Sequence, residues 1–122
     1  AMVVDNIGNV YVGNLGGSIV RKWTATINDV ALFAGGGANP PSFTFQPATS
    51  VVLSSTPLFK NFQIIGTSLY FLARSVSTSR IFEIININGA PQIAIILQTN
   101  TPGPIANAFC FNPNDGYWYV AY

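Results

Sequence analysis

The feature that most constrains the fold is a short apolar segment with a central tyrosine, which occurs three times. It is Val-Tyr-Val at 10–12, Leu-Tyr-Phe at 69–71 and Trp-Tyr-Val at 118–120. Short segments rich in β-branched and aromatic residues, bounded by Gly, Asn or Asp, are typical of β-strands joined by tight turns. Three related strands in one chain indicate a repeat architecture, in which each unit buries its apolar faces against its neighbours.

Further apolar segments surround each tyrosine strand, and residues that tolerate the backbone angles of tight turns separate them. The predicted strands are 3–4, 9–14, 19–23 and 30–33 in the first unit, 62–65, 67–71, 79–84 and 92–97 in the second, and 108–111 and 117–122 in the third. The sequence therefore predicts an all-β fold with two four-stranded antiparallel units and the first half of another.

A proline-rich stretch interrupts the repeat after the first unit. The units span about 3–37, 59–99 and 105–122, within a single domain of 122 residues. Residues 38–58 are predicted to form an inserted loop or ribbon. Two short β-like pieces inside it, 42–45 and 51–53, are expected at sheet edges, because proline lacks the amide donor that a central strand needs.

The first unit also has a recognisable run of motifs. These are the pair Val3-Val4 before Asp5, the turn Gly8-Asn9, the run from Ile19 to Lys22, and a closing Ala34-Gly35-Gly36. In this order they resemble a blade of the NHL-type β-propeller family. The chain departs from the family at Gly13-Asn14, where Ala-Asp is usual. The later units keep only the order of strands and turns. The resemblance implies rigid four-stranded blades, which in this family serve as platforms for proteins, nucleic acids or glycans and in some members carry enzyme sites built from His and metal.

The strands are apolar on both faces, since Leu69 and Phe71 oppose Tyr70 and Leu72. In the last strand Trp118 and Val120 likewise oppose Tyr117 and Tyr119. Such strands are covered on both faces, as a blade between two other blades is. In the alternative fold, a two-sheet β-sandwich, one face of each sheet is polar. Because propellers close with roughly four to eight blades, we expect a partial propeller, completed by other blades of a longer polypeptide or by oligomerisation. The unpaired strand edge at 117–122 favours self-association.

The composition narrows the functional classes. Hydrophobic residues make up 49% of the chain and charged residues 7%, against about 25% charged residues in ordinary domains. Either neighbours in a larger assembly cover much of the surface, or the surface is polar through Asn, Gln, Ser and Thr, as in secreted and virion proteins. On composition we expect an extracellular or virion setting. The basic residues are scattered and the net charge is +1, which argues against nucleic acid as a partner, because phosphates need several converging cations. No apolar run approaches the ~18 residues of a membrane span.

Catalytic chemistry is nearly absent from the sequence. It has no histidine, which is the commonest general base and metal ligand. We therefore predict a non-enzymatic chain with no catalytic residue, metal or cofactor. Asp5 and Asp115 occupy the same turn of two units and could form a paired-carboxylate site, although capping the turn is their ordinary role. Cys110, between two phenylalanines, is predicted to be a small buried apolar residue.

Three functions remain. The first is a structural or protein-interaction module that self-associates or docks onto a partner, with Tyr117, Tyr119 and Tyr122 at the interface. The second is a lectin-like module in which Trp23, Tyr117, Trp118 and Tyr122 stack on sugar rings, although blade packing is the ordinary role of such side chains. The third is a fragment of a larger propeller enzyme whose site lies outside this chain.

Overall fold

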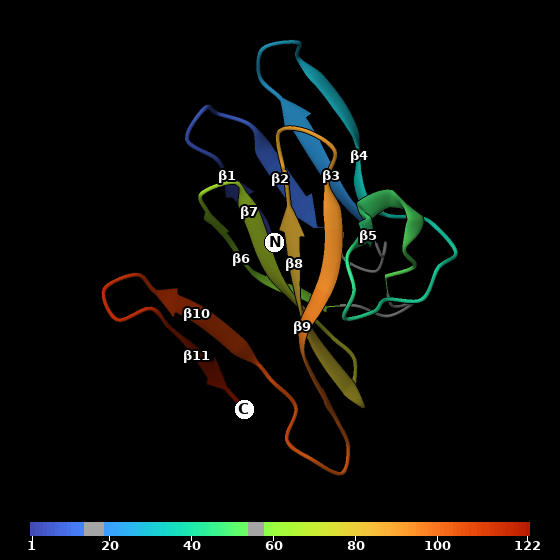
Figure 1. Ribbon diagram of the computed structural model, residues 1–122, viewed down its shortest axis with the longest axis vertical. Helices are drawn as coiled ribbons and strands as arrows, with labels where there is room; N and C mark the ends of the chain where they lie inside the picture. The colour runs from blue at the N-terminus through green and yellow to red at the C-terminus, as the bar shows by residue number, and fades with distance from the viewer. Residues whose placement is uncertain (14–18, 54–57) are drawn as a thin grey trace.

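The computed structural model describes residues 1–13, 19–53 and 58–122, which fold into three antiparallel β-sheets (Figure 1). Within these ranges there is no α-helix, and a 3₁₀ turn, η1, spans Ala48–Ser50. No helix in the same ranges is long and apolar enough to cross a membrane. The prediction of an all-β fold is confirmed.

The first sheet contains the four strands predicted for the first unit, in chain order. They are β1 (Met2–Val4), β2 (Val10–Gly13), β3 (Ile19–Thr24) and β4 (Asp29–Gly35). Two of the predicted turn residues have the expected left-handed backbone: Gly8 has a φ of 92° and Asn28 a φ of 50°. Glycine and asparagine accept this region most readily, so the turns end these strands where the sequence indicated.

The second sheet contains the predicted second unit and one extra strand. Its strands are β6 (Leu58–Ile65), β7 (Ser68–Arg74), β8 (Thr78–Ile85) and β9 (Gln92–Asn100), with β5 (Gln46–Pro47) on the outer edge of β9. The strands predicted at 42–45 and 51–53 are wrong. The hydroxyl of Ser42 accepts the amide hydrogen of Thr44 at 3.0 Å, which makes a local turn, and Val51 lies in an isolated bridge with Asn39 and in no strand.

The third sheet is a hairpin formed by β10 (Ala108–Asn112) and β11 (Tyr117–Ala121). Its turn includes Gly116, which has a φ of 77°. These two strands lie where the sequence predicted strands, at 108–111 and 117–122.

The first and second sheets share a structural detail, a β-bulge between their third and fourth strands as counted from the strand before the tyrosine strand. The pairing of β3 with β4 shifts by a bulge between Val20 and Arg21, and the pairing of β8 with β9 shifts between Ile81 and Phe82. When the two tyrosine strands are aligned, these bulges fall at the same position. A bulge increases the local twist of a sheet, so both sheets gain twist at the same position.

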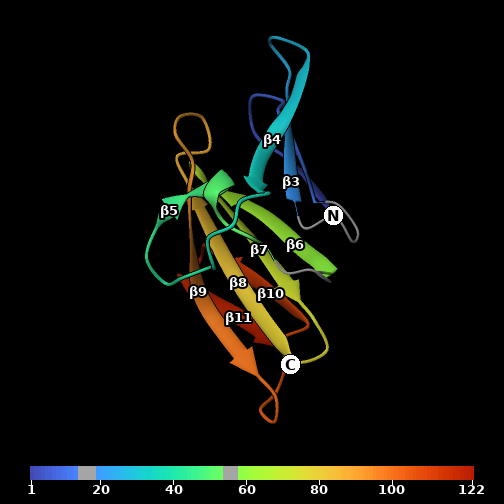
Figure 2. The ribbon, with the colours of Figure 1, turned by 90° about the vertical axis from the view of Figure 1, so that its right-hand side faces the viewer.

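The three sheets stack in layers with the second sheet in the middle (Figures 1 and 2). Two apolar clusters join the layers, one on each face of the second sheet. Leu69 and Phe71 of β7 belong to the cluster shared with the first sheet. Tyr70 and Leu72 of the same strand belong to the cluster shared with the third sheet. The second sheet is therefore covered on both faces, as its lack of polar alternation predicted.

The three sheets converge at the strands β1, β6 and β10, which we call the first strands. Strand β6 contacts β1 on one side and β10 on the other. At the opposite edges of the first two sheets the insert fills the space, since β5 pairs with β9 while η1 contacts β4 (Figure 2). The layers thus fan outward from a line of first strands.

Candidate interaction surface

The three tyrosines that fall in register lie on the same face of their sheets. Tyr11 points into the cluster between the first and second sheets, and Tyr70 points into the cluster between the second and third. Tyr119 points away from the stack and is 51% exposed. Each sheet turns its tyrosine face toward the next sheet along the chain, and in the third sheet this face is uncovered.

In the first sheet the tyrosine hydroxyl binds a buried carboxylate. Tyr11 donates to Asp5 Oδ2 at 3.1 Å, and the carboxylate also accepts the amides of Ile7 at 3.1 Å and Asn9 at 2.9 Å. Burial alone would raise the pKa of Asp5, but these hydrogen bonds outweigh it, so the pKa is lowered and the carboxylate stays charged. Burial and the same carboxylate raise the pKa of Tyr11.

The other two tyrosines have the same type of partner. Tyr70 donates to Glu83 Oε2 at 2.6 Å, and burial together with this hydrogen bond raises the pKa of Tyr70 to about 12. Tyr119 donates to Asp115, which also accepts the amide of Tyr117 at 2.9 Å, and these bonds lower the pKa of Asp115. Three of the four carboxylates of the chain are therefore engaged by tyrosines of their own sheets.

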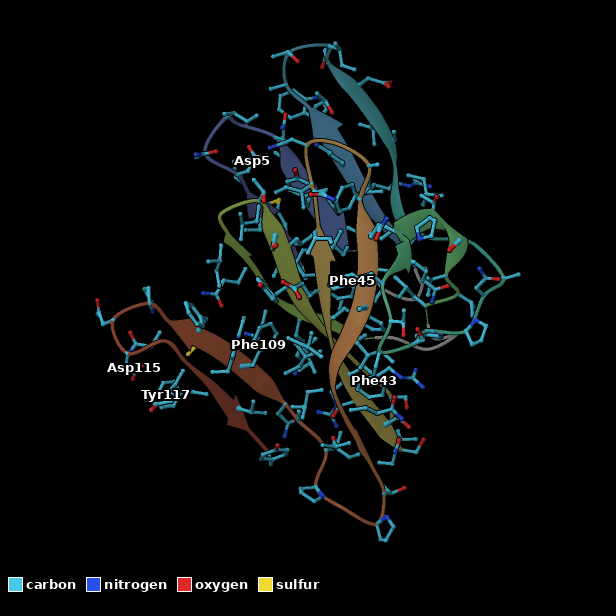
Figure 3. The ribbon with its side chains drawn as sticks, viewed as in Figure 1. Asp5, Phe43, Phe45, Phe109, Asp115 and Tyr117 are labelled. Carbon is cyan, nitrogen blue, oxygen red and sulfur yellow. The ribbon has the colours of Figure 1, made fainter. Side chains whose placement is uncertain are left out.

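The structure does not bring the predicted carboxylate pair together. Asp5 belongs to the first sheet and Asp115 to the third, and they lie well apart (Figure 3). Each accepts the turn amides that follow it, which is the capping role. In the described part of the chain no cluster of three His, Cys, Asp or Glu side chains is placed to hold a metal ion.

The first sheet has an uncovered apolar face on the side opposite its tyrosine. We call it the outer face of the first sheet and define it by Val12, Arg21, Trp23, Val30 and Leu32. The exposed fractions of Val12, Val30 and Leu32 are 42%, 58% and 44%. A shallow hollow of about 280 Å³ is lined by four of the five residues, all except Leu32. Arg21 is the only charged side chain in this set.

The corresponding positions of the second sheet are buried. They follow from the strand registers and are occupied by Phe71, Phe82, Ile84, Ile93 and Ile95, each at most 4% exposed. They are buried because the first sheet and the insert residues Ala48, Val51 and Leu53 pack in the same cluster. The outer face of the first sheet therefore has the position and the apolar character of a surface that receives another sheet, and uncovered surfaces of this kind mark interaction sites.

The third sheet also has an uncovered outer face, which we define by Cys110, Tyr117 and Tyr119. Tyr117 is 67% exposed, and a hollow of about 420 Å³ opens over this hairpin. Cys110 is exposed, so the prediction of a buried cysteine is wrong. Strand alternation explains the error, because Phe109 and Phe111 turn inward to Trp118 and leave the cysteine between them on the outer side.

The four residues predicted to stack on sugars do not share one surface. Trp118 packs inward, with its ring 4.7 Å from that of Tyr70 and 4.9 Å from that of Phe111. Trp23 lies on the outer face of the first sheet, at the other side of the stack.

The exposed tyrosines of the predicted interface lie at the other end, on or just after β11. Tyr117 and Tyr119 share one face, and Tyr122, which follows the strand, is 57% exposed. The sequence predicted uncovered flanks in general terms but did not identify Val12, Val30 and Leu32. The signal that could have identified these three residues was the alignment of the first-sheet strands with the fully apolar strands of the second sheet.

Comparison with protein-family models, with curated proteins and with solved structures gives no match.

Proposed function

We propose that this chain is a non-enzymatic structural and protein-interaction module, a piece of an NHL-like β-propeller that associates with further sheets through its outer faces. The observation that carries the proposal is the contrast in burial between equivalent positions. Apolar side chains in the second sheet are buried by the first sheet and the insert, whereas their counterparts Val12, Val30 and Leu32 are 42–58% exposed.

The arrangement of the layers supports the propeller. Blades of a propeller converge at one edge around a central axis and pack face to face. The contacts of β6 with both β1 and β10 fit this geometry, and so do the repeated bulge and the tyrosine face turned toward the next sheet.

A non-enzymatic role is supported by the chemistry of the polar groups. The sequence has no histidine. Asp5, Glu83 and Asp115 are engaged by tyrosines, and Lys22 donates to the backbone carbonyl of Ile87 at 2.7 Å, where it ties the first sheet to the second. These charged side chains are held in contacts that stabilise the fold.

The experiment is to introduce charge on the outer face of the first sheet and to follow association by sedimentation velocity. In a double variant, Val12→Asp with Val30→Asp, we expect the fold to persist, because both side chains are already partly in water, and the association of the wild-type chain to be lost. The control is Val76→Asp, at a turn residue that is 93% exposed. Equal association of wild type and double variant would contradict the proposal.

Glycan binding is the second candidate, and one observation favours it. Trp23 lines the hollow of the outer face, and its indole N–H donates to Asn28 Oδ1 at 3.1 Å, which fixes the ring. A fixed, partly exposed indole offers a platform for a sugar ring. Titration with a glycan panel should then change the tryptophan fluorescence of the wild type but not of Trp23→Phe. An unchanged spectrum with every glycan would exclude this function.

A further inference from the structure

We propose that the partner of the first sheet's outer face is the third sheet of a second copy of this chain, in a head-to-tail contact. This inference rests on the proposed function and names its partner. It follows from three observations: the direction in which the sheets are stacked, the contact by which the third sheet is held, and the charges on the two outer faces.

The stacking has one direction. Within the chain the tyrosine face of one sheet packs on the opposite face of the next, first for Tyr11 against the second sheet and then for Tyr70 against the third. The two faces left uncovered are the tyrosine face of the third sheet and the opposite face of the first. These are the two kinds of face that pair twice inside the molecule, so a second copy supplies the missing partner for each.

The contact that holds the third sheet predicts which residues meet. Gln63, opposite Tyr70 in the second sheet, exchanges two hydrogen bonds with the backbone of Phe111, at 3.2 and 3.4 Å. In the third sheet, Cys110 is opposite the tyrosine and so corresponds to Gln63. In the first sheet, Val4 corresponds to Phe111, because each lies opposite the residue that precedes the tyrosine.

A head-to-tail contact of the same kind therefore places Cys110 of one copy beside Val4 of the next. Val4 is 54% exposed and lies on the outer side of β1, since its neighbour Val3 turns inward to the first cluster. Both residues lie on first strands, which is where the sheets of one chain approach each other.

The charges of the two outer faces are complementary. Arg21 lies at the position in the first sheet that the buried Phe82 occupies in the second, and it gives the outer face of the first sheet one positive charge. Asp115, held on Tyr119, gives the outer face of the third sheet a negative charge. Two identical outer faces packed together would instead oppose like charges, which disfavours a contact of equal faces.

Two copies joined by two such contacts hold about five blades' worth of strands, within the roughly four to eight blades at which propellers close. A head-to-tail contact either closes into a ring or continues as an open chain. In a ring every outer face of the first sheet is covered by a hairpin of β10 and β11, and in an open chain every such face is covered except the one at the end.

The test uses Cys110 and one introduced cysteine. The variant Val4→Cys is oxidised under mild conditions, or treated with a short bismaleimide, at a concentration at which the wild type associates. Residues 4 and 110 of one chain lie on opposite outer sides of the stack, so a link between them joins two chains. We expect covalent multimers, located by peptide mapping at residues 4 and 110, and their loss in Val4→Cys with Cys110→Ser. The matched control, Val76→Cys, should give no such product.

The outcomes separate this inference from the proposed function. If the wild-type chain associates but Val4→Cys gives no 4–110 link, the head-to-tail contact alone is overturned. A 110–110 link in the wild type also overturns it, because it shows two third sheets in contact, as does a 4–4 link in the variant that lacks Cys110. A chain that stays monomeric throughout overturns both.

Discussion

Equivalent positions in the first two sheets should differ sharply in their contribution to stability. Ile93 and Val30 occupy the same place in the repeat, since Ile93 lies opposite Ile84 and Val30 lies opposite Trp23. Ile93 is 1% exposed in the cluster formed with the first sheet and the insert, whereas Val30 is 58% exposed on the outer face. The perturbation is alanine at each position in turn.

The expected magnitudes follow from these burials. Truncation of a fully buried isoleucine to alanine lowers the free energy of unfolding by about 2–5 kcal/mol, through lost transfer energy and the cavity that remains. Val30→Ala removes two methyl groups that are more than half in water, and at ~0.8 kcal/mol per fully buried carbon its cost should stay below about 1 kcal/mol.

The assay is urea unfolding followed by tryptophan fluorescence, at a protein concentration low enough for the chain to be monomeric. With a dependence on urea of about 1–3 kcal/mol per molar, Ile93→Ala should lower the midpoint by roughly 1 M or more, and Val30→Ala by a few tenths. If the two substitutions cost the same under these conditions, the assignment of one covered and one uncovered face would be refuted.

Three further predictions concern polar groups and close packing. Hydrogen bonds lower the folded pKa of Asp5 below its ordinary 3.8, so the stability that the charged carboxylate contributes is present above that pH and is lost as the pH falls through the folded value. Asp5→Asn should therefore lower the melting temperature at neutral pH, and the difference from wild type should shrink in acid. A difference that stays constant with pH would contradict this. Gly37→Ala should destabilise the fold by about 1–3 kcal/mol or more in urea unfolding, because a Cβ there would lie 2.2 Å from the backbone at the end of η1. The control Gly89→Ala should have a mild effect, because its Cβ would meet nothing closer than 4.0 Å. Equal losses of stability in the two variants would be inconsistent with the packing. The pKa of Tyr70 is raised from 10.0 to about 12, so the stability of the fold should fall as the pH rises through this window. Tyr70→Phe should remove part of that fall in melting curves recorded at alkaline pH. An identical decline in both proteins would exclude a contribution from this tyrosine.

Local chemistry predicted the strands of the three units well. Turn residues such as Gly8 and Asn28 adopt backbone angles that few other residues tolerate, so the ends of the neighbouring strands follow from the sequence. The apolar run on both faces of β7 likewise predicted a sheet covered on both sides.

Other features depended on contacts that no local pattern contains. In residues 42–45 the alternation was β-like, but the hydroxyl of Ser42 competes for the amide of Thr44 and makes a turn. The exposure of Cys110 depends on the direction in which the hairpin of β10 and β11 packs, which the aromatic contacts of Trp118 decide. The carboxylate partners of the tyrosines also appear only in the folded chain, since Glu83 reaches Tyr70 from a neighbouring strand.

The measurement that tests the central claim most directly is the solution mass of the wild-type chain by light scattering over a concentration series. If the outer faces are surfaces that receive other sheets, the mass should rise from the 13.1 kDa of one chain to at least twice that value. A mass that stays at 13.1 kDa up to the highest concentration would contradict self-association through these faces.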